Sequence, residues 1–182
     1  MTEGERSLIA AVVTTPIGPL TLSASAKGLT GLLFALDRAD AGLGDGPASP
    51  EASAILEDAA RQLDEYFCGG RQAFDLPMDL AGTPFQQEVW QAIARIPFGE
   101  TASYAAIAAA AGNPLAYRAA GTACGANPVA IVIPCHRVVG SGRGLHGFGG
   151  GLEVKRWLLD HEARHAPRRQ SAQPSLIEVA RV

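Results

Sequence analysis

Cys135 and His136 carry the side chains of this chain that are best suited to covalent chemistry. They follow a β-branched run at residues 131–133 and Pro134. A thiol near an imidazole can lose its proton to the ring and attack an electrophilic carbon as a thiolate. A free cysteine is more often a small buried hydrophobe, and neighbours along a strand point to opposite faces. We expect Pro134 to turn the chain out of a buried strand, and Asn127 to tie a sharp turn just before it.

Glu162 is the third residue of interest, because it continues the apolar stripe of the last predicted helix, residues 152–163. Val154, Leu158 and Glu162 are spaced four apart and therefore share one face. The helix dipole disfavours a carboxylate in the last turn. Either this helix end is frayed and the acid exposed, or the acid is buried and needs a partner. In the second case Glu162 would orient His136, which would take the thiol proton.

The elements that would position these residues begin at Thr83, which opens a T-x-x-Q capping box with Gln86. The helix that follows ends before Pro97 and has one apolar side, formed by Phe85, Val89, Trp90 and Ile93. Two more helices are predicted in "SYAAIAAAAG" and in "LAYRAAGTACGA", the latter with Asn113 and Pro114 as cap and first turn. Helix, glycine-containing turn and helix form a helix-turn-helix pattern, although two closely packed alanine-rich helices would look the same.

The first third of the chain predicts a β-meander. Short apolar runs in "LIAAVVTT" and "LTLSASAKGLTGLLFA" are separated by the turn "PIGP". A polar loop at residues 37–53 leads into a helix from about Ala52, which Gly69 and Gly70 end. "FDLPMDL" reads as an extended piece before a linker.

Composition bounds the function classes. Of the 182 residues 47% are hydrophobic and 18% charged, which is typical of a soluble globular protein. There is no transmembrane run, and three widely spaced cysteines indicate a reducing cytosol and no disulfide framework. The net charge of −3 argues mildly against nucleic acid. Residues 101–152, however, contain no acid and three arginines, Arg118, Arg137 and Arg143, which would suit a DNA-binding face.

Glycines crowd the loop between residues 140 and 151. Three of them satisfy G-x-G-x-x-G, but more glycines precede the helix and no acid follows at the ribose distance, so we reject a dinucleotide site. The loop is either a floppy connector or a pocket wall where a flat ligand meets backbone amides. Phe148 would add an aromatic face.

Several motifs together resemble the O6-alkylguanine-DNA alkyltransferases, the methylated-DNA–protein-cysteine methyltransferases. The strongest are "PCHRVVG", "GNP", "YRAAG" and "GFGGGLxxKxWLLxHE", all within residues 83–162; "TPIGPLTL" and "LDEYFCGG" are weaker matches. The resemblance implies an α+β fold. An N-terminal antiparallel sheet plus helix of ribonuclease-H-like type would span residues 1–76 and a linker 77–82. A mostly helical domain with the helix-turn-helix and the active-site cysteine would span 83–163, followed by a mobile tail, 164–182.

The resemblance also assigns roles. Cys135 is similar to the alkyl acceptor, with His136 and Glu162 as its activating partners and a water between thiol and imidazole. Asn127 matches the residue that braces the turn before the active site, and Tyr104 a tyrosine at the guanine ring edge. The DNA-binding positions are Arg118, which would replace the flipped nucleotide in the stack, and Ala119, Ala120 and Gly121, a narrow helix face for the minor groove. The base pocket would be lined by Val138, Phe148 and Gly149.

This chain departs from the family pattern in three places. Phe148 stands where tyrosine is common, so a hydroxyl is lost from the pocket wall. Gly125 stands where some members have a basic residue, which weakens phosphate contact. The zinc ligands of some members are missing, and we expect neither a metal nor a cofactor.

The implied activity is a single irreversible transfer of an alkyl group from O6-alkylguanine in double-stranded DNA to Cys135. The protein would act in the cytoplasm as a monomer, away from membranes, and cooperative binding along DNA stays open. Three alternatives remain. They are a Cys-His-Glu thiol hydrolase with turnover, a non-catalytic lesion binder, and a helix-turn-helix regulator whose cysteine belongs to the core. The alkyltransferase hypothesis requires a reachable thiol and a Glu162 directed at His136.

Overall fold

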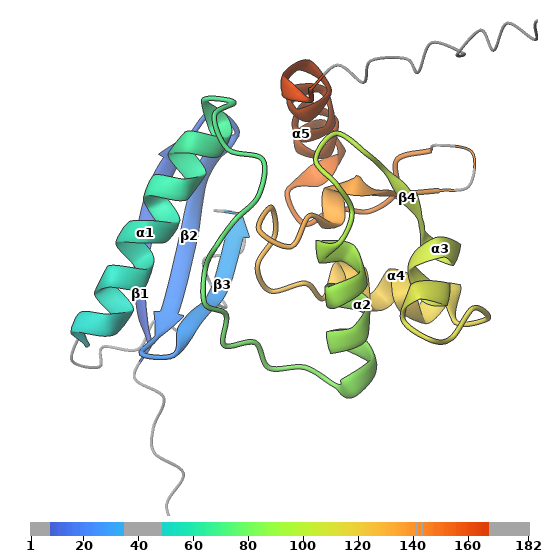
Figure 1. The fold of residues 1–182 in the computed structure, drawn as a ribbon, viewed down its shortest axis with the longest axis horizontal. Coiled ribbons are helices and arrows are strands. Elements are labelled where there is room, and N and C mark those ends of the chain that lie inside the picture. Colours follow the sequence, from blue (N-terminus) through green and yellow to red (C-terminus); the bar gives the residue numbers. More distant parts are fainter. Residues whose placement is uncertain (1–7, 35–48, 141, 143, 168–182) are drawn as a thin grey trace, which may run out of the picture.

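The computed structural model describes residues 8–34, 49–140, 142 and 144–167. A β-sheet with one covering helix forms the N-terminal part, and a cluster of helices forms the C-terminal part beside it (Figure 1). Most of the predicted polar loop, Arg143 and the tail beyond Pro167 lie outside the described residues. Within the described part, no helix is long and apolar enough to cross a membrane.

The N-terminal part is the predicted meander with its helix. Strands β1 (Ile9–Thr15), β2 (Gly18–Ser25) and β3 (Gly28–Phe34) form an antiparallel sheet in chain order. Helix α1 (Pro50–Phe67) begins where the Ser49 hydroxyl accepts a hydrogen bond from the backbone of Ala52 at 3.0 Å, and it covers one face of the sheet (Figure 1). Its buried face carries Leu56, Leu63 and Tyr66 among others, which seals the sheet from water.

Among its described residues, the C-terminal part contains four helices and a small parallel pair of strands. In chain order the elements are α2 (Pro84–Ala94), β4 (Ala102–Ser103), α3 (Tyr104–Ala110), α4 (Tyr117–Gly125), the 3-10 turn η2 (Cys135–Arg137), β5 (Val138–Val139) and α5 (Gly151–His165). The predicted capping box of Thr83 and Gln86 is present at the start of α2. Helix α5 runs two residues further than predicted at its C-terminal end.

Two local predictions were wrong. Asn113 does not cap α4: its carbonyl accepts a hydrogen bond from the backbone of Ala116 at 3.0 Å, so residues 113–116 form a turn and the helix starts at Tyr117. Residues 129–133 are not a continuous strand but make isolated bridges, and Ile131 has a left-handed φ of 73°. The chain therefore leaves extended geometry before Pro134.

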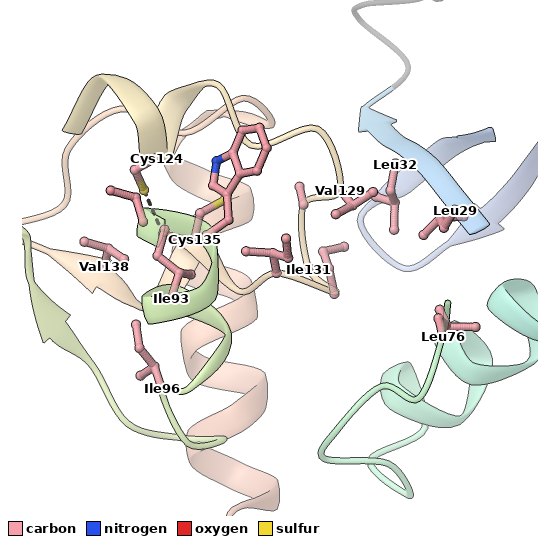
Figure 2. Close-up of a cluster of buried hydrophobic side chains, with 14 of the residues drawn as sticks. Leu29, Leu32, Leu76, Ile93, Ile96, Cys124, Val129, Ile131, Cys135 and Val138 are labelled. Atoms are coloured by element: carbon pink, nitrogen blue, oxygen red, sulfur yellow. Dashed lines mark hydrogen bonds between the residues drawn. The ribbon is translucent and has the colours of Figure 1, made fainter. Parts of the chain in front are cut away.

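The two parts share a continuous core. The backbone nitrogen of Leu32 in β3 donates to the carbonyl of Pro128 at 2.8 Å, and Leu32 forms a bridge with Val129. Figure 2 shows Val129 and Ile131 lying between Leu29 and Leu32 of β3 and the residues around Cys135. The segment that carries the predicted acceptor is thus attached to the N-terminal sheet.

Candidate active site

Cys135 is the first residue of η2, directly after Pro134. It is 6% exposed, yet it lines a pocket of about 350 Å³, a size typical of small-molecule sites. The other walls are residues 32–34 of β3, Cys124 and Gly125 at the end of α4, Asn127, Ala130, and residues 147–149 of the glycine-rich loop. The thiol is therefore covered by protein on most sides and faces a cavity large enough for a small ring.

Asn127 braces the turn between α4 and Cys135. Its side-chain amide donates to the carbonyl of Ile133 at 2.8 Å, and its side-chain oxygen accepts from the backbone of Val129 at 3.1 Å. These two bonds tie both ends of the irregular segment to one side chain, which restricts where Cys135 can lie.

The structure brings His136 and Glu162 together. His136 Nε2 lies 2.7 Å from Glu162 Oε1, and both side chains are buried. Burial lowers the pKa of His136, so the ring is neutral near pH 7. Because a carboxylate oxygen accepts, Nε2 carries the ring hydrogen and Nδ1 keeps its lone pair. Among the described residues Nδ1 has no hydrogen-bond partner.

Glu162 receives hydrogen bonds from three more residues. The Tyr66 hydroxyl donates to Oε1 at 2.9 Å, the Gly99 backbone to Oε2 at 3.0 Å, and the Arg137 guanidinium to both oxygens at 2.9 to 3.2 Å. Burial alone would raise the pKa of Glu162, but the hydrogen bond from His136 and the hydrogen bonds and charge of Arg137 outweigh it and lower the pKa to about 2. The carboxylate is ionised and fixed on all sides.

Cys124, near the end of α4, contacts the backbone of Cys135. Its Sγ lies 3.9 Å from the Cys135 carbonyl (Figure 2). A hydrogen bond from the Cys124 thiol lowers the pKa of Cys135 below 9.0; burial opposes this, and the Asn127 amide and the Lys155 ammonium assist it. The same contact and burial raise the pKa of Cys124. Cys135 is therefore the thiol that ionises first.

Lys155 is fully buried and fixes the chain after η2. Its ammonium donates to the carbonyl of Val138 at 2.7 Å and to that of His146 at 3.0 Å. Val138, predicted to line the base pocket through its main chain, is itself buried and does not line the cavity that holds Cys135.

Phe148 and Gly149 do line that cavity. The ring of Phe148 packs edge-on against Phe34 of β3, with centroids 5.2 Å apart. Gly150 lies so close that an added Cβ would be 2.8 Å from the Phe34 ring. The N-terminal part therefore supplies one wall of the pocket, which nothing in the sequence indicated.

Helix α4 presents part of the predicted DNA-binding face. Arg118 and Ala119 are exposed and Gly121 is half-buried against the Tyr104 ring. Ala120 is fully buried, because it lies on the same side of the helix as Ala123 and Cys124, so it is not part of the exposed face.

Two apolar side chains beside Arg118 were missed. Leu115 is 90% exposed and Tyr117 is 49% exposed, and the Arg118 guanidinium lies over the Tyr117 ring at 5.7 Å. Their signal in the sequence is their position, because Leu115 lies in the turn before α4 and Tyr117 is the first residue of that helix. Tyr66 and Cys124 also gained roles that sequence reasoning did not assign. Arg137 does not belong to a DNA-binding face as the run of arginines suggested, because its side chain is buried and hydrogen-bonded to Glu162.

Comparison with known proteins places both parts of the chain in one family. The family model described as "6-O-methylguanine DNA methyltransferase, ribonuclease-like domain" matches residues 8–80, and the "DNA binding domain" of the same family matches residues 84–164. A methylated-DNA–protein-cysteine methyltransferase of Methanosarcina barkeri is 44% identical over 152 residues, which are 83% of this chain and 94% of the relative.

Another relative of that name, from Mycobacterium bovis, is 44% identical over 155 residues, which are 85% of this chain and 92% of the relative. The crystal structure of Mycobacterium tuberculosis OGT in complex with DNA matches with a TM-score of 0.76 and 43% identity, over 86% of this chain and 94% of that one. These matches confirm three predictions, namely the family resemblance, the α+β fold class and a DNA-binding methyltransferase. The chain belongs to the 6-O-methylguanine DNA methyltransferase family.

Proposed function

We propose that this methyltransferase repairs DNA by moving the alkyl group of an O6-alkylguanine onto Cys135, once per molecule. The observation that carries the proposal is the contact between Glu162 and His136, next to a thiol that lines a pocket. A carboxylate, an imidazole and a thiol in this order form an activated nucleophile. The three free cysteines of the described chain suit a reducing compartment such as the cytosol.

The thiol proton leaves through the imidazole. Nδ1 of His136 holds a lone pair and makes no direct hydrogen bond to Cys135, so we propose that one water accepts from Sγ and donates to Nδ1. Glu162 keeps the ring in the tautomer that this relay needs. The hydrogen bond from the Cys124 thiol lowers the pKa of Cys135 and so favours its thiolate form.

The transfer is a displacement at the alkyl carbon. A lone pair of the Cys135 sulfur forms the new S–C bond, and the C–O6 bond breaks with its electron pair going to guanine. Guanine then takes a proton at its ring nitrogen, so thiol and alkylguanine become thioether and guanine. Tyr104, at the start of α3, donates a hydrogen bond where negative charge develops on the ring. A thioether is stable because a thiolate is a poor leaving group at a saturated carbon, so the protein is consumed.

The lesion reaches the pocket when the nucleotide leaves the base stack. Unstacking costs a few kcal/mol, and the weakened pairing of a lesion reduces this cost. Helix α4 offers small side chains, Ala119 and Gly121, to the narrow minor groove, and exposed Arg118 enters the gap in the stack. Leu115 and Tyr117 extend this contact as apolar groups beside Arg118.

The test is the intact mass of the protein after incubation with a DNA duplex that contains one O6-methylguanine. We expect one added methyl group per protein, at most one turnover, and none in Cys135→Ser. Cys68→Ser is the matched control, since it removes an exposed thiol and should retain full stoichiometry. Fragment spectra must assign the methyl group, because Cys124 and Cys135 lie on the same tryptic peptide between Arg118 and Arg137.

The same experiment separates the alternatives. A lesion binder would bind the duplex without gaining mass, and a thiol hydrolase would turn over an ester many times after an initial burst. A regulator with a core cysteine would bind DNA equally well as Cys135→Ala and would leave the lesion intact. Repeated turnover on DNA, or methylation elsewhere than Cys135, refutes the proposal.

A further inference from the structure

Tyr66 links the N-terminal helix α1 to the buried carboxylate of α5. It is fully buried, and its hydroxyl donates to Glu162 Oε1 at 2.9 Å, the same oxygen that accepts from His136. The two residues are 96 positions apart in the chain. Burial raises the pKa of Tyr66, and the negative charge of Glu162 raises it further. The hydroxyl therefore stays protonated and acts as a donor.

The Tyr66 ring is held so that the hydroxyl has little freedom. It packs against Phe74 and Phe98 at centroid distances of 5.5 and 6.0 Å. The backbone carbonyl of Tyr66 lies 2.8 Å from Nε2 of His161, the residue just before Glu162. Helix α5 is thus attached to Tyr66 at two successive positions, through a side chain and through the backbone.

We propose that Tyr66 is a positioning residue of the alkyl-transfer site, whose hydroxyl fixes Glu162 against His136 and shares the charge of the carboxylate. The inference rests on the proposed function and adds a role for the N-terminal domain in activating Cys135. A donor on Oε1 makes the carboxylate a weaker acceptor for the imidazole hydrogen. The ring therefore gains less from protonation and stays in the neutral form that can accept the thiol proton.

This sharing of charge determines how the pKa of His136 changes when the Tyr66 hydroxyl is removed. Without the hydroxyl, Glu162 stabilises the imidazolium more strongly, so the pKa of His136 rises. A neutral ring is needed for transfer, so activity at acid pH is lost first. The charged and titratable groups that face His136 and Glu162 from the surrounding elements do not change when the Tyr66 hydroxyl is removed. They are Arg137 from η2, and Lys155 and His161 from α5.

The variant is Tyr66→Phe, which keeps the ring and removes one oxygen. We expect the acid limb of the pH–rate profile for alkyl transfer to move up by about one pH unit, since a hydrogen bond to a charged group is worth roughly that much. Transfer at acid pH would fall by up to about tenfold, while the rate above pH 8 would stay within about threefold of the wild type. The full-length chain and a duplex with one O6-methylguanine are used.

Phe74→Leu is the control, because it disturbs packing around the same ring and leaves the hydroxyl in place. It should change the urea midpoint without moving the pH profile. A second readout needs no DNA: the rate at which iodoacetamide labels Cys135, followed by mass in a Cys68→Ser background, should show the same shift in Tyr66→Phe.

Three possible outcomes decide whether Tyr66 has this positioning role. A shifted acid limb in Tyr66→Phe alone supports the positioning role. An unmoved limb in Tyr66→Phe, or an equal shift in Phe74→Leu, overturns it while the proposed function stands. If the wild type itself gains no methyl group, the proposed function fails and this role falls with it.

Discussion

Replacing Glu162 by glutamine should destabilise the fold by about 3 kcal/mol at pH 7. The pKa of this carboxyl falls from an ordinary 4.5 to about 2 in the folded chain, and each pKa unit corresponds to about 1.4 kcal/mol. Glutamine resembles the protonated acid and leaves the buried Arg137 without its counter-charge. Removal of one partner of a buried ion pair costs about 3 to 5 kcal/mol, so two independent arguments agree.

The effect depends on pH in a defined direction. A group whose folded pKa is depressed stabilises the fold above its unfolded pKa, and this stabilisation is lost as pH falls from about 4.5 towards 2. The gap between wild type and Glu162→Gln should therefore narrow from about 3 kcal/mol at pH 7 to about 1.5 kcal/mol at pH 3. Other acids are common to both proteins and cancel in the difference.

The assay is urea unfolding followed by tryptophan fluorescence at both pH values, with Glu88→Gln on the exposed side of α2 as the control. Surface substitutions of this kind stay within about 0.5 kcal/mol of the wild type. If Glu162→Gln is as stable as the control at pH 7, or if its deficit is the same at pH 3, the buried network does not hold the carboxylate as described.

Three further outcomes are expected. Arg118→Ala should weaken binding to duplex DNA and lower the magnitude of the slope of log affinity against log salt concentration by about one, while stability in urea stays unchanged. Anisotropy titrations at several salt concentrations measure this slope, and an unchanged slope would place Arg118 outside the DNA contact. Asn127→Ala loses two hydrogen bonds, so it should lower the free energy of unfolding measured in urea by about 1 to 3 kcal/mol and slow alkyl transfer. A loss of stability with an unchanged transfer rate would contradict the bracing role of Asn127. Phe34→Ala should open space beside Phe148 and raise the rate with O6-butylguanine relative to O6-methylguanine in duplex DNA, and a constant ratio would falsify the wall assigned to it.

Sequence reasoning succeeded where the physical cause is local or periodic. The capping box at Thr83 involves residues three apart, so the start of α2 could be read directly. Helical spacing put Glu162 on the same face as Val154 and Leu158 but left its burial open, and in the structure the side chain is buried at 1% exposure. Short apolar runs separated by glycine and proline turns were enough to predict the N-terminal meander.

The features that could not be predicted from the sequence depend on contacts between distant segments. The bond from Tyr66 to Glu162 joins residues 96 apart, and no spacing rule covers such a pair. Phe34 reaches the pocket because β3 lies against the segment at Pro128, which is a property of how the two parts pack. Local rules also misplaced the start of α4, since Asn113 can serve a turn as well as a cap.

Ile131 adopts a backbone conformation that β-branched residues rarely tolerate, and its side chain is completely buried. The conformation costs of order 1 to 3 kcal/mol, while burial of an isoleucine side chain returns about 1.5 to 3 kcal/mol. The two quantities are of similar size, so the side chain itself holds the backbone in the unfavourable state. A glycine at this position would remove the strain and the anchor together, and would leave total stability almost the same. The loop would then sample several geometries. The single position of the Cys135 sulfur therefore depends on a residue whose backbone conformation is unfavourable.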